Sequence, residues 1–274
     1  MFFDNFKGLL IVLVVFGHII GPLIHQAIIL KALYIFVYSF HVPAIVFVCG
    51  YFSRNDKPVK RQILKFAFLF VLLEAIYRLL YFWLFGRPML HNLFIPTWTL
   101  WFLASLITWR LVLRILNPSD RTLKYWILGS VFIGLVCGSI PGISYPASAS
   151  RSIVFFPFFL LGYRYKAVKF PIAAIHKQTA LFLLLPLLTI SFLIAPRFDV
   201  RWFYGSCSYC TLGIDLLSGC TLRAALYIFA SIIGLAAMQL TGNSSTPLTA
   251  IGRHSLSIFL IHGIPVKLLH YGLS

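Results

Sequence analysis

Charged residues are scarce in this sequence, and acidic residues are the scarcest. Only 11% of the 274 residues are charged, and Asp and Glu together number 6. A soluble domain usually has about a quarter of its residues charged, because a globule in water needs a polar shell. Here 60% of the residues are hydrophobic, and they come in long runs. This composition excludes an ordinary soluble domain and indicates that lipid surrounds most of the surface.

A metal-binding signature is also missing. Two of the five cysteines, Cys207 and Cys210, form a C-x-x-C pair, but no second pair of ligands accompanies it. We therefore expect no metal site. Because Cys220 falls in the same predicted loop, a disulfide within this group stays open if the loop faces an oxidising space.

Positive charge, in contrast, is in excess: Lys and Arg number 23, and the net charge is +17. In a soluble protein this excess would suggest nucleic acid as the partner. In a membrane protein the same residues gather in cytoplasmic loops and contact anionic headgroups. We therefore expect membrane lipids rather than nucleic acid as partners, while an anionic cytosolic ligand such as CoA stays open.

The apolar runs predict an all-α fold, a polytopic transmembrane helical bundle of about nine spans, within a range of eight to ten. Each run is long enough, or nearly so, to cross roughly 30 Å of hydrocarbon as a helix. The runs cover residues 8–26, 32–53, 62–85, 97–116, 123–140, 151–166, 179–195, 221–240 and 252–271. We expect residues 1–274 to form a single transmembrane domain.

The loops between these runs differ in their content of Lys and Arg. If the N-terminus is cytoplasmic, the loops on that side hold most of the basic residues and the opposite loops hold few. Cytoplasmic loops are the ones enriched in Lys and Arg. The pattern therefore predicts a multi-pass protein with a cytoplasmic N-terminus, and we expect it in the plasma membrane.

Four titratable side chains fall well inside the predicted spans: His18, His41, Glu74 and His262. Ionisable groups at such depth are costly and usually face a cavity or a partner. At 1.5 Å per residue, each lies roughly 13–19 Å from a basic residue near the inner end of its run. This shared depth predicts a polar hollow near the middle of the bilayer.

The first run places Lys7 and His18 on one helical face, because three- and four-residue steps connect them. A cation at the cytoplasmic rim can hold a phosphate, and an imidazole at depth can take a proton from a hydroxyl. The alternative is an anchoring Lys7 and a structural His18 bonded to a backbone carbonyl. The sequence alone leaves both interpretations open.

Glu74 and Arg78 are four residues apart on the third run and can form an ion pair. Such a pair is often structural. Glu74 is alternatively a catalytic group that orients an imidazole, as the carboxylate of an acyl-transfer triad does.

Two further pairs are candidates for binding substrates. Trp98 and Trp101 share a face at the outer end of the fourth run and form either an aromatic belt or a wall on which a sugar stacks. Arg54 and Arg61 lie at the inner end of the second and third runs. They are either ordinary cytoplasmic charges or contacts for the phosphates of CoA.

Four segments of this sequence resemble the acyltransferase 3 family of membrane O-acyltransferases, and they follow the family's order. They are residues 3–18, 36–52, 100–103 and 252–262. The first contains the family pattern of Arg or Lys, ten residues and His, here Lys7 and His18. The second contains His41, and the fourth ends in His262. Taken together the sequence is most similar to the fucose 4-O-acetylase-like subgroup.

The resemblance implies transfer of an acyl group, most often acetyl, from acyl-CoA on the cytosolic side to a hydroxyl of a carbohydrate or similar acceptor. His18 would be the catalytic histidine, and Lys7 would support it or bind the donor. His41, Trp98 and Trp101 would line the site. No bound cofactor is implied, since acetyl-CoA or another acyl-CoA is the donor substrate.

Two other functions stay open. The histidines and Glu74 inside the spans, together with Arg78, would suit the proton relay of a proton-coupled membrane transporter. The short chain would also suit a catalytically inactive member of the same fold.

Overall fold

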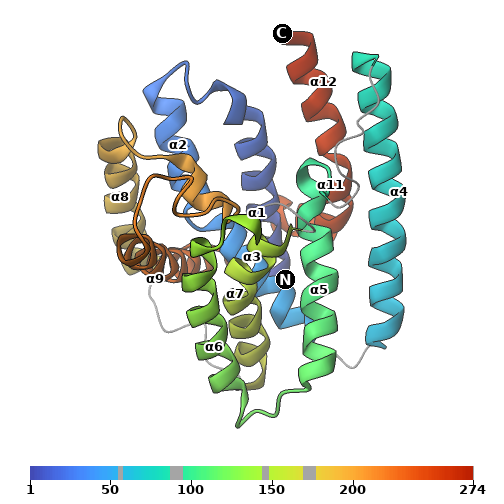
Figure 1. The fold of residues 1–274 in the computed structure, drawn as a ribbon, viewed down its shortest axis with the longest axis vertical. Helices are drawn as coiled ribbons and strands as arrows, with labels where there is room; N and C mark the ends of the chain where they lie inside the picture. The colour runs from blue at the N-terminus through green and yellow to red at the C-terminus, as the bar shows by residue number, and fades with distance from the viewer. Residues whose placement is uncertain (55–57, 87–94, 144–147, 169–176, 274) are drawn as a thin grey trace. The chain divides into compact units, whose positions relative to one another are not determined.

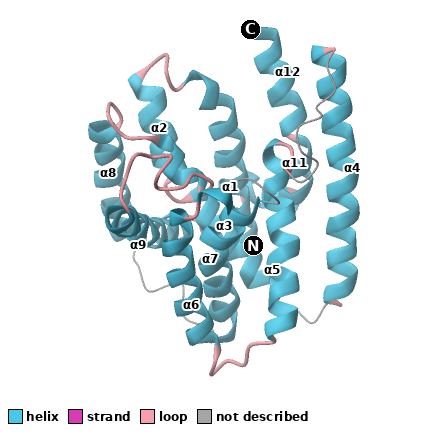
Figure 2. Ribbon diagram, in the orientation of Figure 1, coloured by secondary structure: helices cyan, strands magenta, loops and turns pink. Residues whose placement is uncertain are grey.

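The computed structural model describes residues 1–54, 58–86, 95–143, 148–168 and 177–273. Within these ranges the chain consists of helices, turns and short connections, with no strand (Figure 2). The predicted all-α fold is therefore confirmed. By length and composition, the helices that can cross a membrane include Phe2–Leu23, Ile28–Ser53, Trp98–Leu116, Lys177–Ile194 and Leu216–Leu240. The total of nine spans stays a prediction.

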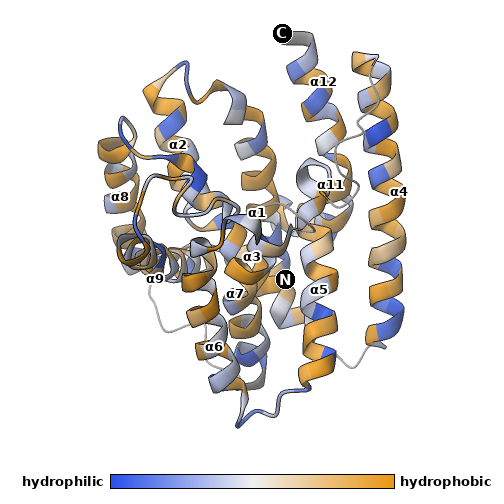
Figure 3. Cartoon of the chain, viewed as in Figure 1, coloured by the Kyte–Doolittle hydropathy of each residue, from blue (hydrophilic) through white to orange (hydrophobic). Residues whose placement is uncertain are grey.

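Apolar side chains cover the outside of the described helices, as a lipid environment requires. Ile115, Phe182 and Leu217 are each at least 75% exposed. Figure 3 shows hydrophobic residues along much of α4 (Val59–Phe85), with hydrophilic residues at its Val59 end and again farther along the helix. In water such surfaces would aggregate, whereas in a bilayer they face acyl chains.

Two of the predicted runs are broken beside a histidine. The run 32–53 divides into α2 (Ile28–Tyr38) and α3 (His41–Ser53), and the run 252–271 divides into α10 (Pro247–Arg253), α11 (Ser255–Ile261) and α12 (Gly263–Leu273). Pro43 has no N–H for the carbonyl of Ser39, and Pro265 has none for that of Ile261. Each proline therefore accounts for a break just before it.

The described chain forms two compact units. Unit 1 comprises Met1–Val48, Lys169–Phe203 and Ala224–Ser274, and unit 2 comprises Cys49–Val168 and Tyr204–Arg223. Unit 1 holds α1 (Phe2–Ile20), α2, the start of α3, α8 (Lys177–Ile194), the short helix Val200–Tyr204 except for Tyr204, most of α9 (Leu216–Leu240), and α10 to α12. Unit 2 holds α4, α5 (Trp101–Leu116), α6 (Leu123–Val136) and α7 (Ala149–Val168). The single domain over 1–274 stays a prediction.

In unit 1, α1 packs closely against α10 through two glycines. A Cβ added to Gly8 would overlap the carbonyl of Leu248, and one added to Gly252 would overlap the carbonyl of Asp4. Small residues allow the backbones of membrane helices to approach in this way. The helix pair therefore fixes the end of α1 that carries Lys7.

Asn5 ties the same two elements together by hydrogen bonds. Its Nδ2 donates to the carbonyls of Gly242 (2.7 Å) and Ser244 (2.8 Å). Its Oδ1 accepts from the hydroxyls of Thr246 (3.1 Å) and Thr249. These bonds satisfy the whole amide of a side chain that is 1% exposed. They hold the segment leading into α10 against the first turn of α1.

In unit 2, α5 and α6 both pack on α7 (Figure 1). Tyr209, in the segment before α9, anchors this segment to the end of α6. Its N–H donates to the carbonyl of Gly138 (2.7 Å) and its hydroxyl to that of Leu135 (2.6 Å). Its ring lies against Gly138 and Gly219, where a Cβ would come within 2.5 Å. Burial raises the pKa of Tyr209 to about 12.

Candidate active site

Lys7 lies in an ionic cluster at the start of α1. Its Nζ is 2.9 Å from Oδ1 of Asp4, and the guanidinium Nε of Arg253 is 3.9 Å from Oδ2 of the same carboxylate. Two side-chain cations therefore share one carboxylate, which leaves the cluster net positive. Because the Lys7 side chain is about a quarter exposed, the cluster can still attract an anion such as a phosphate.

His18 lies in the last turn of α1, beside His262. The two ring centroids are 5.3 Å apart with the planes tilted by 35°. At 1.5 Å per residue, His18 is roughly 16 Å along α1 from Lys7. Lys7 and His18 therefore lie at opposite ends of one helix with a second imidazole beside His18, while their depths in the membrane stay a prediction.

His262 is held by the backbone of its own helix. It is 5% exposed, and its Nδ1 is 2.7 Å from the carbonyl oxygen of Phe259. Because a carbonyl oxygen only accepts hydrogen bonds, Nδ1 must carry the hydrogen, and in the neutral ring Nε2 is then the basic nitrogen. The ring of His270 belongs to the same end of α1, with Nε2 3.2 Å from the carbonyl of Ile19.

His41 is oriented in the same way at the start of α3. Its Nδ1 is 2.8 Å from the carbonyl oxygen of Val37, and the ring is 2% exposed. Tyr38 packs edge-on against it with ring centroids 4.5 Å apart. The ring of Tyr38 also covers Gly17, where a Cβ would come 2.7 Å from it. Tyr38 therefore connects His41 to the turn of α1 that carries His18.

Glu74 on α4 holds the segment that precedes the tryptophans of unit 2. Its Oε1 accepts from Nε (3.0 Å) and an Nη (2.8 Å) of Arg78 and from the hydroxyl of Thr97 (2.7 Å). Its Oε2 accepts from the N–H of Thr97 (3.0 Å). The predicted ion pair with Arg78 is therefore confirmed. These bonds make Glu74 a positioning residue for Thr97 and Trp98, and its catalytic role stays a prediction.

Replacing Glu74 with Gln should lower the stability of the protein by about 2 kcal/mol, since bonds to a charged acceptor are lost and the cation of Arg78 loses its counter-ion. The measurement is chemical unfolding in detergent. A Glu74→Leu, Arg78→Leu double variant should recover part of the loss, because no unpaired charge is left behind. Equal stability of the wild type and Glu74→Gln would contradict this role.

The two tryptophans occupy different surroundings within unit 2. Trp98 has a φ of +44°, a left-handed conformation that costs energy for a large residue, and its ring lies 6.4 Å from that of Tyr77. The ring of Trp101 faces the guanidinium of Arg151 at 4.9 Å, and an Nη of Arg151 lies 3.5 Å from the hydroxyl of Ser206. Trp98 thus lies beside Tyr77 and Trp101 beside Arg151, and a shared stacking wall stays a prediction.

The two arginines proposed for the donor phosphates also differ. An Nη of Arg54 is 2.6 Å from Oδ1 of Asp120, and its guanidinium lies 4.8 Å from the ring of Tyr163. Arg61 is exposed in the first turn of α4. Asp120 therefore holds the guanidinium of Arg54, whereas the side chain of Arg61 is exposed on the outside of α4.

The candidate residues are thus divided between the two units. Unit 1 brings together His18 and His262, with His41 joined through Tyr38 and with Lys7 at the other end of α1. Unit 2 holds Glu74 with Arg78 and Thr97, and separately Trp101 with Arg151. Arg151 was not recognised as a candidate from the sequence, because it resembles any other loop charge until its stacking partner is known.

Comparison with protein families gives a match that covers residues 2–274. The matching family model is described as an acyltransferase domain. Comparison with curated proteins and with solved structures gives no match.

Proposed function

Because this chain belongs to the acyltransferase 3 family, we propose that it moves an acetyl group from acetyl-CoA to a hydroxyl of a carbohydrate acceptor. Its helices and its family together make it an integral membrane acyltransferase. The observation that supports this mechanism best is the His18–His262 pair, with ring centroids 5.3 Å apart. Acetyl as the acyl group and a glycan as the acceptor follow from the resemblance to fucose 4-O-acetylase-like proteins.

His18 is the proposed general base. It removes the proton of the acceptor hydroxyl while the hydroxyl oxygen attacks the thioester carbonyl of the donor. The tetrahedral intermediate then collapses, the carbon–sulfur bond breaks, and the imidazolium returns the proton to the thiolate of CoA. The products are the O-acyl ester and free CoA. No acid or base is consumed over the whole cycle.

His262 is the proposed partner of His18. Its Nδ1–H donates to the carbonyl of Phe259. Its Nε2 is therefore the nitrogen that would exchange a proton with the neighbouring imidazole of His18. Lys7, backed by Asp4 and Arg253, is the proposed site for a phosphate of the donor. Arg61 is a second candidate for the same role.

Trp98 and Trp101 are the proposed contacts of the acceptor. Aromatic rings with a few polar neighbours are typical walls of small-molecule sites. Trp101 has such a neighbour in Arg151, and the strained backbone of Trp98 is of the kind that gathers at ligand sites. His41 is the remaining candidate for lining the site.

The direct test is transfer of label from radioactive acetyl-CoA to a fucose-containing glycan by the purified protein. Labelling should require both substrates. In the same preparation, acetyl-CoA should raise the unfolding temperature, because a ligand that binds the native state stabilises it by mass action. An unfolding temperature that does not respond to any acyl-CoA would contradict the proposed donor.

A proton-coupled transporter is the second candidate, since adjacent intramembrane imidazoles also suit a proton relay. Flux of a substrate across liposomes without acyl-CoA would favour it. An inactive member of the family would bind acyl-CoA and give no labelled product. Label transfer, substrate flux and acyl-CoA binding together therefore separate all three functions.

The proposed orientation predicts that Cys210 faces the outside of the plasma membrane. The structure holds Cys210 as an exposed free thiol, while Cys207 is buried and Cys220 is partly buried. A membrane-impermeant maleimide added to intact cells should label the protein, and Cys210→Ser should remove most of the label. Labelling that appears only after permeabilisation would instead place this segment in the cytoplasm. By the same count of spans, the N-terminus would then lie outside.

A further inference from the structure

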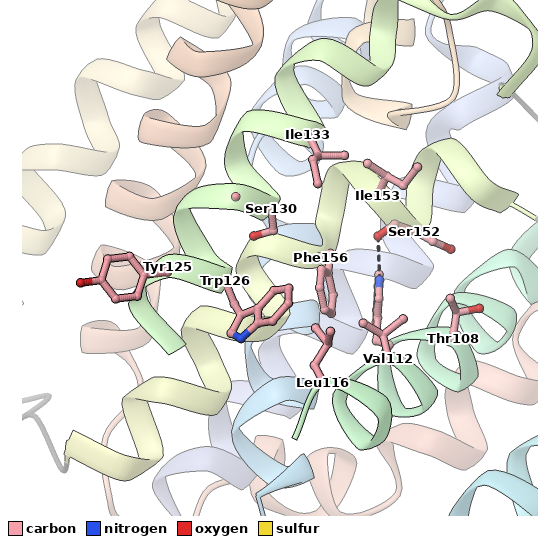
Figure 4. A pocket seen from close by; sticks show the side chains of 12 residues that line it. Thr108, Val112, Leu116, Tyr125, Trp126, Ser130, Ile133, Ser152, Ile153 and Phe156 are labelled. Atoms are coloured by element: carbon pink, nitrogen blue, oxygen red, sulfur yellow. Dashed lines mark hydrogen bonds between the residues drawn. The ribbon is translucent and has the colours of Figure 1, made fainter. Parts of the chain in front are cut away.

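An apolar groove runs along the side of unit 2, between α5 and α6 and over α7. Its volume is about 550 Å³. Figure 4 shows Val112 and Leu116 of α5 on one side, Trp126 and Ile133 of α6 on the other, and Phe156 of α7 between them. None of these residues belongs to the proposed catalytic cluster, so the groove requires its own explanation.

Four polar side chains of the groove wall have hydrogen-bond partners in the protein, namely Thr108, Trp109, Ser130 and Ser152. Thr108 Oγ1 donates to the carbonyl of Ala104 (3.0 Å), Ser130 Oγ to that of Ile127 (2.7 Å) and Trp109 Nε1 to that of Ser152 (2.7 Å). The hydroxyls of Ser105 and Ser152 bond to each other (2.7 Å). Sites for polar small molecules instead offer a few polar groups aimed at the ligand. This wall is therefore suited to a hydrocarbon chain.

Positive charge lies beside one end of the groove. Leu116 ends α5 and Tyr125 begins the α6 side of the groove, and Arg114, Arg121 and Lys124 close to them are all exposed. The nearby acidic residue, Asp120, is paired with Arg54 at 2.6 Å. The surplus at this end is cationic, and by the positive-inside rule it lies at the cytoplasmic headgroup level.

The length of the groove fits one leaflet. From Tyr125 to Ile133 the α6 side extends about 12 Å, at 1.5 Å per residue. Half of a typical hydrocarbon core is roughly 15 Å deep. Gly129 lies within this stretch and lines the groove, and a Cβ added there would meet nothing within 4 Å. The absent side chain leaves space in the middle of the path.

We propose that this groove binds one acyl chain of an anionic glycerophospholipid of the cytoplasmic leaflet, with the lipid phosphate at Arg121 and Lys124. The apolar wall contacts the acyl chain, and the cationic end selects the anionic headgroup. The alternative occupant is a helix from a second copy of this chain. Because such a helix would not require the positive charge at the groove end, we favour the lipid, and the test distinguishes the two. The proposal does not depend on which reaction the protein catalyses.

The test is native mass spectrometry of the full-length protein in detergent, with phosphatidylglycerol and phosphatidylcholine of identical chains added in turn. The wild type should retain phosphatidylglycerol at least about tenfold more than phosphatidylcholine. Gly129→Phe should lower this retention about tenfold by filling the groove. The matched control is Leu128→Phe, because Leu128 is the neighbouring residue on α6, is 65% exposed and does not line the groove. Its retention should equal that of the wild type.

The headgroup is tested separately by an Arg121→Gln, Lys124→Gln variant. It should lose the preference for phosphatidylglycerol and keep the weaker binding of phosphatidylcholine. A Lys60→Gln, Lys65→Gln variant removes two other exposed cations, in the first turns of α4, and should keep the preference. Equal binding of both lipids by the wild type would overturn the anionic headgroup.

Retention by Gly129→Phe equal to that of the wild type would overturn the groove as the site. If the same variant changes the oligomeric state while lipid retention stays constant, the occupant is a second copy and the proposal fails. Gly129→Leu is the smaller variant for the case in which Gly129→Phe does not fold, and it should reduce retention in the same direction. Gel filtration and the helical circular dichroism signal report on folding.

Discussion

Replacing His18 with Ala should lower kcat for acyl transfer by at least about 100-fold, the usual contribution of a general base. The remaining alanine cannot accept the hydroxyl proton, and the bond from Nδ1 of His262 to the carbonyl of Phe259 keeps that ring from moving into the position of the lost imidazole. The effect should fall on kcat more than on KM for acetyl-CoA, because the proposed donor contact is Lys7, roughly 16 Å away along α1. The measurement is the rate of label transfer at saturating donor.

The matched control for His18 is His25→Ala. His25 is exposed in the turn that follows α1, and its removal should leave the rate unchanged. The His18→Ala protein should also keep the rise in unfolding temperature with acetyl-CoA, which shows that it is folded and binds the donor. A folded His18→Ala variant with undiminished transfer would remove His18 as the base.

The second large effect is expected at Gly252. Its replacement with Ala puts a Cβ on the backbone of α1, at the carbonyl of Asp4 and the nitrogen of Gly8. Backbone atoms cannot move aside as a flexible side chain can, so α10 must separate from α1. We expect a loss of about 3 kcal/mol, at the upper end of the usual cost of overpacking, or failure to obtain folded protein. The measurement is the unfolding transition in detergent.

Gly234→Ala is the control for Gly252. Gly234 lies in α9 of the same unit, and a Cβ there would make an ordinary contact of 3.7 Å with Ala44. Its replacement should be neutral or stabilise the helix by about 0.5–1 kcal/mol. Similar losses of stability in both variants would contradict the role of Gly252 in the close approach of α1 and α10.

The helices were predictable because a bilayer fixes how long an apolar run must be, and every predicted run contains at least one helix in the structure. The breaks at Ser39–Phe40 and at His262 were not predicted, since hydropathy is insensitive to backbone hydrogen bonding. Pro43 and Pro265 carried that signal, as each removes one donor from the helix. Pro157 and Pro186, however, lie inside the continuous helices α7 and α8, so a proline in a run does not by itself predict a break.

The candidate site was predictable where it depends on spacing within one helix. Lys7 and His18 follow from the period of α1, and the Glu74–Arg78 pair follows from a separation of four residues. The contacts of Asn5 with the segment before α10 join residues more than 235 positions apart, and those of Arg151 with Ser206 join residues 55 apart. Such pairings depend on how the chain folds back, which no local pattern in one sequence reveals.

The backbone hydrogen bonds of His41 and His262 have a consequence for the chemistry of these imidazoles. Many enzymes aim a histidine with a carboxylate, which in hydrocarbon would add a second ion to be neutralised. Here the main-chain oxygens of Val37 and Phe259 aim His41 and His262. A peptide oxygen has no titration step in the physiological range, so the tautomer of each neutral ring should not change with the protonation of any acid. The main chain thus supplies, without ionic support, an alignment that a chain poor in Asp and Glu could hardly obtain otherwise.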